Sequence, residues 1–110
     1  MASKYMRLQE LIKISAATNQ DRRDAADVGG FRTVIVQVNV LSAAGVGDII
    51  LEHAAMNELN QYEALSSQPI DITATGPITI IVTGHTRFLR WTIPSITGSV
   101  TFSVDLILRD

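Results

Sequence analysis

The sequence predicts an all-β protein, an antiparallel β-sandwich or small barrel with six or seven strands and an N-terminal arm. Valine, isoleucine and threonine, which favour extended backbone, make up 32 of the 110 residues. Apolar and polar residues alternate in runs that recur about every ten residues. Glycine, proline and serine separate these runs, as they do in turns between short strands.

The length of 110 residues predicts one domain. We expect an arm at residues 1–10 and the sandwich at residues 11–110. Residues 3–14 fit either a short helix or an arm that becomes a strand near Leu11. We favour the arm, because the segment ends in alternation. Residues 16–30 are polar and predict a surface loop, with room for one helical turn.

Two alternating runs in the first half of the chain predict a hairpin. In residues 31–41 the valines at even positions share one face, which we expect to point inward. Residues 48–55 form the next run. The small residues between them, Ser42 to Gly47, predict a loop of about six residues that joins two paired strands.

The second half of the chain predicts four further strands, within residues 69–76, 78–84, 85–93 and 99–109. In the last of these, all even-numbered residues from Val100 to Leu108 are apolar and share one face. Trp91 shares its face with Leu89 and Ile93, so we expect it in the core. Arg90 falls on the opposite face, and we expect it to be exposed to water.

The composition excludes several kinds of chemistry. A formal net charge of −2 gives no basic surface for nucleic acid, and no apolar run approaches the ~18 residues of a membrane span. There is no cysteine, and His53 and His85 are the only histidines, so we expect no metal site. No nucleophile motif and no glycine-rich phosphate loop is present. We therefore expect no cofactor and no enzymatic activity.

Three stretches together resemble small β-sandwich virion proteins of tailed bacteriophages and gene-transfer-agent-like particles. The first is DVGGFRTVIVQVNV. The second, IILEHAAMNELNQYEAL, is similar to the family pattern L-Q-H-S-x-D-G-x-x-W-x-x-L, although Met56-Asn57-Glu58 replaces the usual Asp-Gly turn and Tyr62 the usual tryptophan. The third, GHTRFLRWTIPSITGSVTFSVDLIL, resembles the ending R-Y-x-R-(strand)-G-(strand).

The resemblance implies a single antiparallel β-sandwich of jelly-roll type with about 7–8 strands, and a structural protein of the virion that works by binding. Its most favoured role is head decoration, in which it binds the major capsid protein on the outer capsid surface and stabilises the shell. It implies synthesis in the bacterial host cytoplasm and a symmetric homo-oligomer, for example a trimer. The expected contact residues lie in the arm, the polar loop and the second half of the chain: Lys4, Tyr5, Met6, Arg7, Arg22, Arg23 and Arg87.

Two alternatives stay open at this stage. The chain fits a tail, neck or fibre component of the virion, which would be present in far fewer copies than a decoration protein. It also fits a carbohydrate-binding β-sandwich module, which would need Tyr62 or Trp91 exposed on a flat face or loop rim.

Overall fold

The computed structural model describes residues 3–58, 60–65 and 69–110 and is all-β, as predicted. It contains nine antiparallel strands and one short 3-10 helix, η1 (Arg22–Asp24). The long strands are β1 (Ser3–Ile14), β4 (Thr33–Ala54), β7 (Gly76–Val82), β8 (Phe88–Ile93) and β9 (Ile96–Arg109). The other strands have two residues each: β2 (Thr18–Asn19), β3 (Ala26–Asp27), β5 (Glu63–Ala64) and β6 (Ile70–Asp71).

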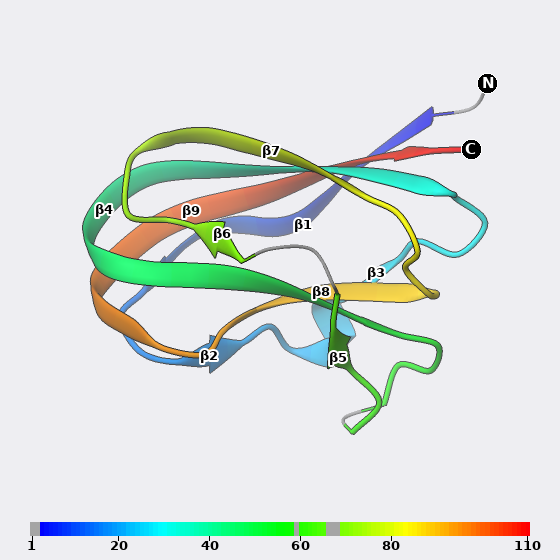
Figure 1. Ribbon diagram of the computed structural model, residues 1–110, viewed down its shortest axis with the longest axis horizontal. Helices are drawn as coiled ribbons and strands as arrows, with labels where there is room; N and C mark the ends of the chain where they lie inside the picture. The colour runs from blue at the N-terminus through cyan, green and yellow to red at the C-terminus, as the bar shows by residue number, and fades with distance from the viewer. Residues whose placement is uncertain (1–2, 59, 66–68) are drawn as a thin grey trace.

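The strands form one strongly curled sheet, a half-barrel (Figure 1). The first half of β4 pairs with β9 on one side and β7 on the other, and β1 pairs with β9. The second half of β4 pairs with β8, β5 and β6, and β8 also pairs with β2 and β3. We call these two halves the upper layer and the lower layer. The predicted two-sheet sandwich is wrong, because β4 runs through both layers without a break.

The hairpin predicted between residues 31–41 and 48–55 is also wrong. The two runs are the ends of β4, and the small residues between them continue the strand and pair with β9. At the bend, Gly45 lies opposite Gly98. A Cβ atom on Gly45 would lie 1.7 Å from the carbonyl oxygen of Thr97, and one on Gly98 would lie 1.9 Å from that of Ala44. Glycine therefore allows the two backbones to approach closely enough for the ribbon to fold over (Figure 1).

The core lies between the two layers. The predicted valine face of β4 and the even-numbered residues of β9 from Val100 to Leu108 are buried there, as expected. Trp91 of β8 is 1% exposed, which confirms its predicted place in the core. Its ring meets that of Phe102 edge to face, with 5.2 Å between the ring centroids. The Nε1 atom of Trp91 donates a hydrogen bond to Gln9 Oε1 at 3.1 Å.

Residues 3–30 differ from the expected elements mainly in their boundaries. Strand β1 begins at Ser3 and pairs with β9 as far as Ile14, so residues 3–10, expected as an arm, lie in the sheet. The polar segment 16–30 contains η1, the expected helical turn, together with β2 and β3. The pairing of β1 with β9 spans nearly the whole chain length, and periodicity within one segment does not reveal such a partner.

Arg90 is 7% exposed, so the prediction that it faces water is wrong. Its Nε atom lies 2.9 Å from Glu52 Oε1, and its guanidinium lies over the Tyr62 ring, 4.2 Å from the ring centroid. The Nη1 atom also donates to the carbonyl oxygen of Gln20 at 3.4 Å. Segments outside the regular alternation therefore cover this side of β8, and an ion pair satisfies the charge that they bury.

We predict that Gly98→Ala lowers the free energy of unfolding by about 3 kcal/mol, because the methyl group meets the Ala44 carbonyl at a residue with φ of +85°. Denaturant unfolding measures the change. Gly30→Ala is the matched control, since Gly30 also has positive φ but open space at its Cβ, and it should cost only about 1 kcal/mol. Equal effects of the two substitutions would show that the close approach is unimportant.

We predict that Arg90→Met lowers the free energy of unfolding by about 3 kcal/mol, because it leaves the Glu52 carboxylate largely buried and without its ion-pair partner. Replacing both residues, as Arg90→Met with Glu52→Met, should restore part of the loss. A double-mutant cycle from denaturant unfolding measures the coupling. Strict additivity of the two single effects would contradict a coupled pair.

Candidate functional site

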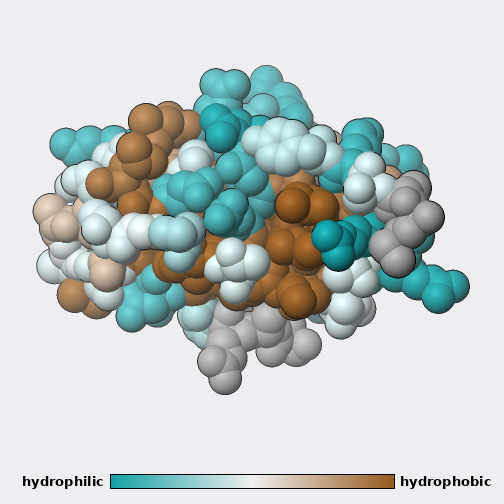
Figure 2. Space-filling view, turned by 90° about the horizontal axis from the view of Figure 1, so that it is seen from above, coloured by the Kyte–Doolittle hydropathy of each residue, from teal (hydrophilic) through white to brown (hydrophobic). Residues whose placement is uncertain are grey.

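The solvent side of the upper layer, which we call the outer face, carries an unusual row of apolar side chains. Tyr5 lies opposite Ile107, Ile107 opposite Ile35, and Ile35 opposite Ile81. These four residues, the apolar row, cross β1, β9, β4 and β7 in register. Ile81 is 68% exposed and Tyr5 61%. Figure 2 looks onto this side and shows a band of hydrophobic side chains beside hydrophilic ones.

A polar row lies next to the apolar row, and Asp105 is its centre. The Asp105 carboxylate accepts hydrogen bonds from Tyr5 Oη at 2.7 Å, Arg7 Nε at 2.9 Å and Asn39 Nδ2 at 2.9 Å. Gln37 and Thr79 continue the row on β4 and β7. The network holds Tyr5 and Arg7 in fixed positions at one end of the outer face.

The charges of this network shift the ionisation of its members. Burial alone would raise the pKa of Asp105, but the hydrogen bonds from Arg7 and Tyr5 outweigh it and the pKa is lowered. The hydrogen bond to Asp105 raises the pKa of Tyr5, with a smaller contribution from burial. At neutral pH the outer face therefore presents a carboxylate, a guanidinium and a neutral phenol.

The apolar and polar rows enclose a shallow hollow of about 250 Å³. Its lining residues come from all four strands of the upper layer: Tyr5, Ile35, Gln37, Thr79, Asp105 and Ile107. Isoleucine side chains form one wall, and the Asp105 network forms the other. Such a surface is suited to receiving an apolar side chain of a protein partner beside a polar rim.

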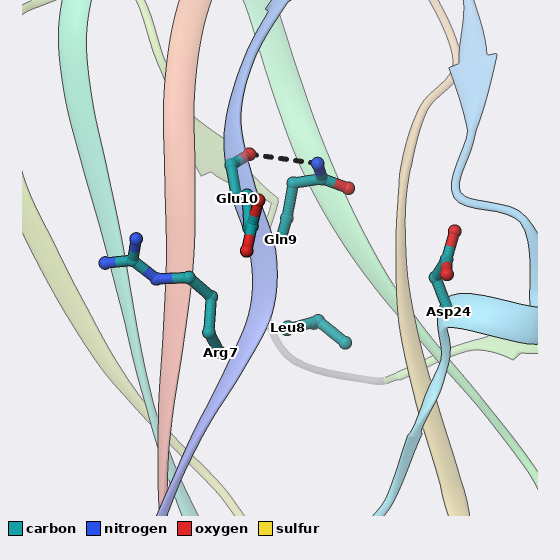
Figure 3. A pocket seen from close by; sticks show the side chains of 5 residues that line it. All are labelled: Arg7, Leu8, Gln9, Glu10 and Asp24. Atoms are coloured by element: carbon teal, nitrogen blue, oxygen red, sulfur yellow. Dashed lines mark hydrogen bonds between the residues drawn. The ribbon is translucent and has the colours of Figure 1, made fainter.

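A second hollow, of about 360 Å³, lies where β1 departs from regular pairing with β9 (Figure 3). Arg7, Leu8, Gln9, Glu10 and Asp24 line it. Figure 3 shows that Arg7 points away from Asp24, while the Gln9 amide donates to the Glu10 carbonyl at 2.9 Å. These ionisable groups do not converge on a common point, so the hollow offers no acid–base pair.

A third hollow, of about 490 Å³, contains three arginines, Arg22, Arg23 and Arg90, beside Asn19, Gln20 and Asp21. Each guanidinium has a carboxylate partner. Arg22 pairs with Glu58 at 3.0 Å, Arg23 with Asp21 at 2.7 Å, and Arg90 with Glu52. The hydrogen bonds from Arg23 lower the pKa of Asp21 to about 2. An incoming anion would have to compete with these carboxylates, so we do not assign an anion site here.

The structure places the seven expected contact residues in separate regions. Tyr5 and Arg7 come together on the outer face around Asp105. Lys4 is exposed on the same strand, and Met6 is partly buried against the core.

The remaining three arginines lie elsewhere. Arg22 and Arg23 are in η1. Arg87 pairs with Asp27 at 3.1 Å and lies over the Phe88 ring. The hydrogen bonds that Asp27 accepts from the Arg87 side chain and from the Gly29 amide lower the pKa of this carboxyl group.

Both histidines have structural contacts. His53 Nδ1 accepts a hydrogen bond from the Thr86 amide at 3.0 Å, and its Nε2 lies 3.6 Å from Glu63. His85 Nε2 lies 2.9 Å from the Phe31 carbonyl, while its Nδ1 is buried and has no hydrogen-bond partner. Among the described residues, no three His, Cys, Asp or Glu side chains gather as a metal site would require. Within the same residues, no helix is long and apolar enough to cross a membrane.

Comparison with known proteins relates the fold to a solved structure. No known family matches the sequence, and no curated protein matches it. The chain is similar in structure to the SPBc2 prophage-derived protein YomS. The TM-score is 0.57, with 14% sequence identity over 96% of this chain and 93% of that chain. At this identity the similarity shows a shared fold.

Sequence reasoning did not identify the isoleucines of the apolar row or Asp105 as site residues. A signal was present, since Ile35, Ile81 and Ile107 each interrupt the otherwise polar face of an alternating strand. It could not be used, because only the register between strands brings these three positions into one row.

We predict that Asp105→Asn destabilises the protein by about 1 kcal/mol at pH 7, because hydrogen bonds to a charged carboxylate are stronger than those to an amide. Because the pKa of Asp105 is lower in the folded state than in the unfolded state, its ionised carboxylate stabilises the folded protein at pH values above the unfolded pKa of about 3.9. This stabilisation is lost as the pH falls through the pKa of the folded state. The difference from wild type should therefore shrink below about pH 4. Thermal unfolding across pH measures it, and a difference that grows in acid would contradict the assignment.

Proposed function

We propose that this protein is a structural component of a bacteriophage virion that acts by binding other proteins and not by catalysis. The observation that carries the proposal is the apolar row, which presents exposed isoleucine and tyrosine side chains on a regular four-stranded surface. Contiguous apolar surface bordered by polar groups is typical of protein interaction sites. The fold similarity to a prophage-derived protein supports a phage origin.

The finer role that we propose is head decoration, with the outer face bound to the major capsid protein. The Asp105 network would form the polar rim of the contact, and the isoleucines would fill apolar pockets of the capsid subunit. Many weak contacts of this kind, repeated over a shell, would be strengthened by avidity. In this role the protein is made in the host cytoplasm, resides on the capsid surface as a homo-oligomer and binds no nucleic acid, cofactor or membrane.

The burial of Trp91 argues against the alternative of a carbohydrate-binding module. A sugar platform needs an aromatic ring with a free face, and Trp91 is inside the core. Tyr62 is only partly exposed, and Arg90 lies over its ring. The two aromatic side chains that this alternative requires, Trp91 and Tyr62, are therefore not free to stack on a sugar.

We predict that the tagged protein co-sediments with purified phage particles, and that Ile107→Lys weakens this binding at least tenfold by placing a charge in the apolar row. The matched control is Val46→Lys, which adds the same charge at an exposed apolar residue on the bend of β4 and should bind normally.

The number of copies per particle separates the possible locations within a virion. Hundreds of copies would support decoration of the head, whereas about a dozen or fewer would place the protein in the tail, neck or fibre. Absence from particles, with the protein found only in the host lysate, would overturn the proposal.

A further inference from the structure

The two edges of the upper layer differ sharply in how they are protected against pairing with another strand. One edge is β1, whose twelve residues include four charged side chains, Lys4, Arg7, Glu10 and Lys13. Its pairing with β9 has two register shifts. Charges and bulges of this kind are the usual means by which an edge strand resists pairing.

The other edge is β7, which has none of these charges or bulges. Its sequence, GPITIIV, contains no charged residue, and its seven residues pair with β4 in unbroken register. No described strand pairs with its second side. Pro77 has no N–H group to donate to β4. Its position in the strand is therefore best suited to one whose backbone groups point away from β4, toward the open side. In an antiparallel strand, the N–H and C=O groups of every second residue point to the same side. Those of Thr79 and Ile81 therefore point to the open side as well.

The side chains of β7 also indicate a missing neighbour. In the inward-facing rows, Val36 and Val38 of β4 are fully buried. Ile80 and Ile78, their partners on β7, are only partly buried. On the outer face, Ile81 ends the apolar row as its most exposed member. The open side of β7 therefore leaves apolar groups exposed on both faces of the sheet, and one added strand would cover them.

We propose that two copies of this protein pair through β7, in antiparallel register about a two-fold axis at Ile80. This pairing places Thr79 of one copy opposite Ile81 of the other, and Ile78 opposite Val82. Apolar side chains then meet across the inner faces, and the hydrogen-bonding groups of Thr79 and Ile81 face each other. With no charge on either strand, the two edges approach without repulsion.

The protection of the β1 edge explains why we expect β7 to pair with the β7 strand of a second copy and not with β1. Head-to-tail pairing of β7 with β1 would build an open filament, and the charges and bulges of β1 oppose it. Pairing of β7 with itself uses the same surface on both copies and closes after two. The result is a dimer, in which Ile81 at the end of each apolar row lies opposite Thr79 of the other copy, and not the trimer that the sequence resemblance implied. This inference does not depend on a phage origin.

We expect weak association, with a dissociation constant in the micromolar range, because a seven-residue edge is small beside a standard interface of about 20–30 residues on each side. Sedimentation equilibrium should give a mass that rises with concentration toward twice the chain mass of 12.0 kDa. Thr79→Lys brings two like charges together and should raise the dissociation constant at least tenfold. Thr97→Lys, an exposed threonine of β9, is the matched control and should dimerise normally.

Cross-linking tests the proposed register directly, since the natural chain has no cysteine. Ile80→Cys places two thiols opposite each other at the two-fold axis and should give a disulfide-linked dimer under mild oxidation. Leu11→Cys, exposed on β1, should not cross-link. A wild-type chain that stays monomeric at all soluble concentrations, or efficient cross-linking through Leu11→Cys alone, would overturn the proposal. Ile107→Lys should still dimerise, so failure of particle binding and failure of dimerisation are separable.

Discussion

The close approach of Gly45 and Gly98 is the constraint on which the rest of this structure depends. Strand β4 and the combined length of β8 and β9 form one long antiparallel ribbon, and a ribbon of β-branched residues resists sharp bending. Two glycines opposite each other remove the side chains that would keep the backbones apart. The ribbon can then fold over, and its valine and leucine faces enclose one core.

Because one sheet forms both layers, the sheet keeps free edges that a closed barrel would not have. The lower layer ends in strands of only two residues, which are too short to serve as templates. The upper layer ends in β1, protected by charges and bulges, and in β7, which is neither charged nor irregular. The outer face of the upper layer carries the apolar row. Exposed apolar surface is therefore concentrated in one half of the molecule, and we propose binding there for this reason.

The sequence predicted the inward faces well, since alternation in residues 31–41 and 99–109 identifies which side chains are buried. It could not predict connectivity, because a run of small residues such as Ala43 to Gly47 is typical of both a turn and a bend in a continuous strand. The sequence also failed to predict that Arg90 is buried. Alternation correctly placed its side chain on the opposite side of β8 from Trp91. Other segments cover that side, and no local pattern reveals them.

The pairing of β1 with β9 joins the first described residues of the chain to the last, with Ser3 opposite Arg109. Strand β9 also lies between β1 and β4, so the central part of the upper layer cannot assemble until residues 96–109 are available. During synthesis on the ribosome, β1 must therefore remain unpaired until residues 96–109 have emerged. Such long-range pairing is typical of proteins that fold in milliseconds to seconds and not in microseconds. The charges of β1 are of the kind that oppose aggregation of an unpaired strand until its partner strand is made.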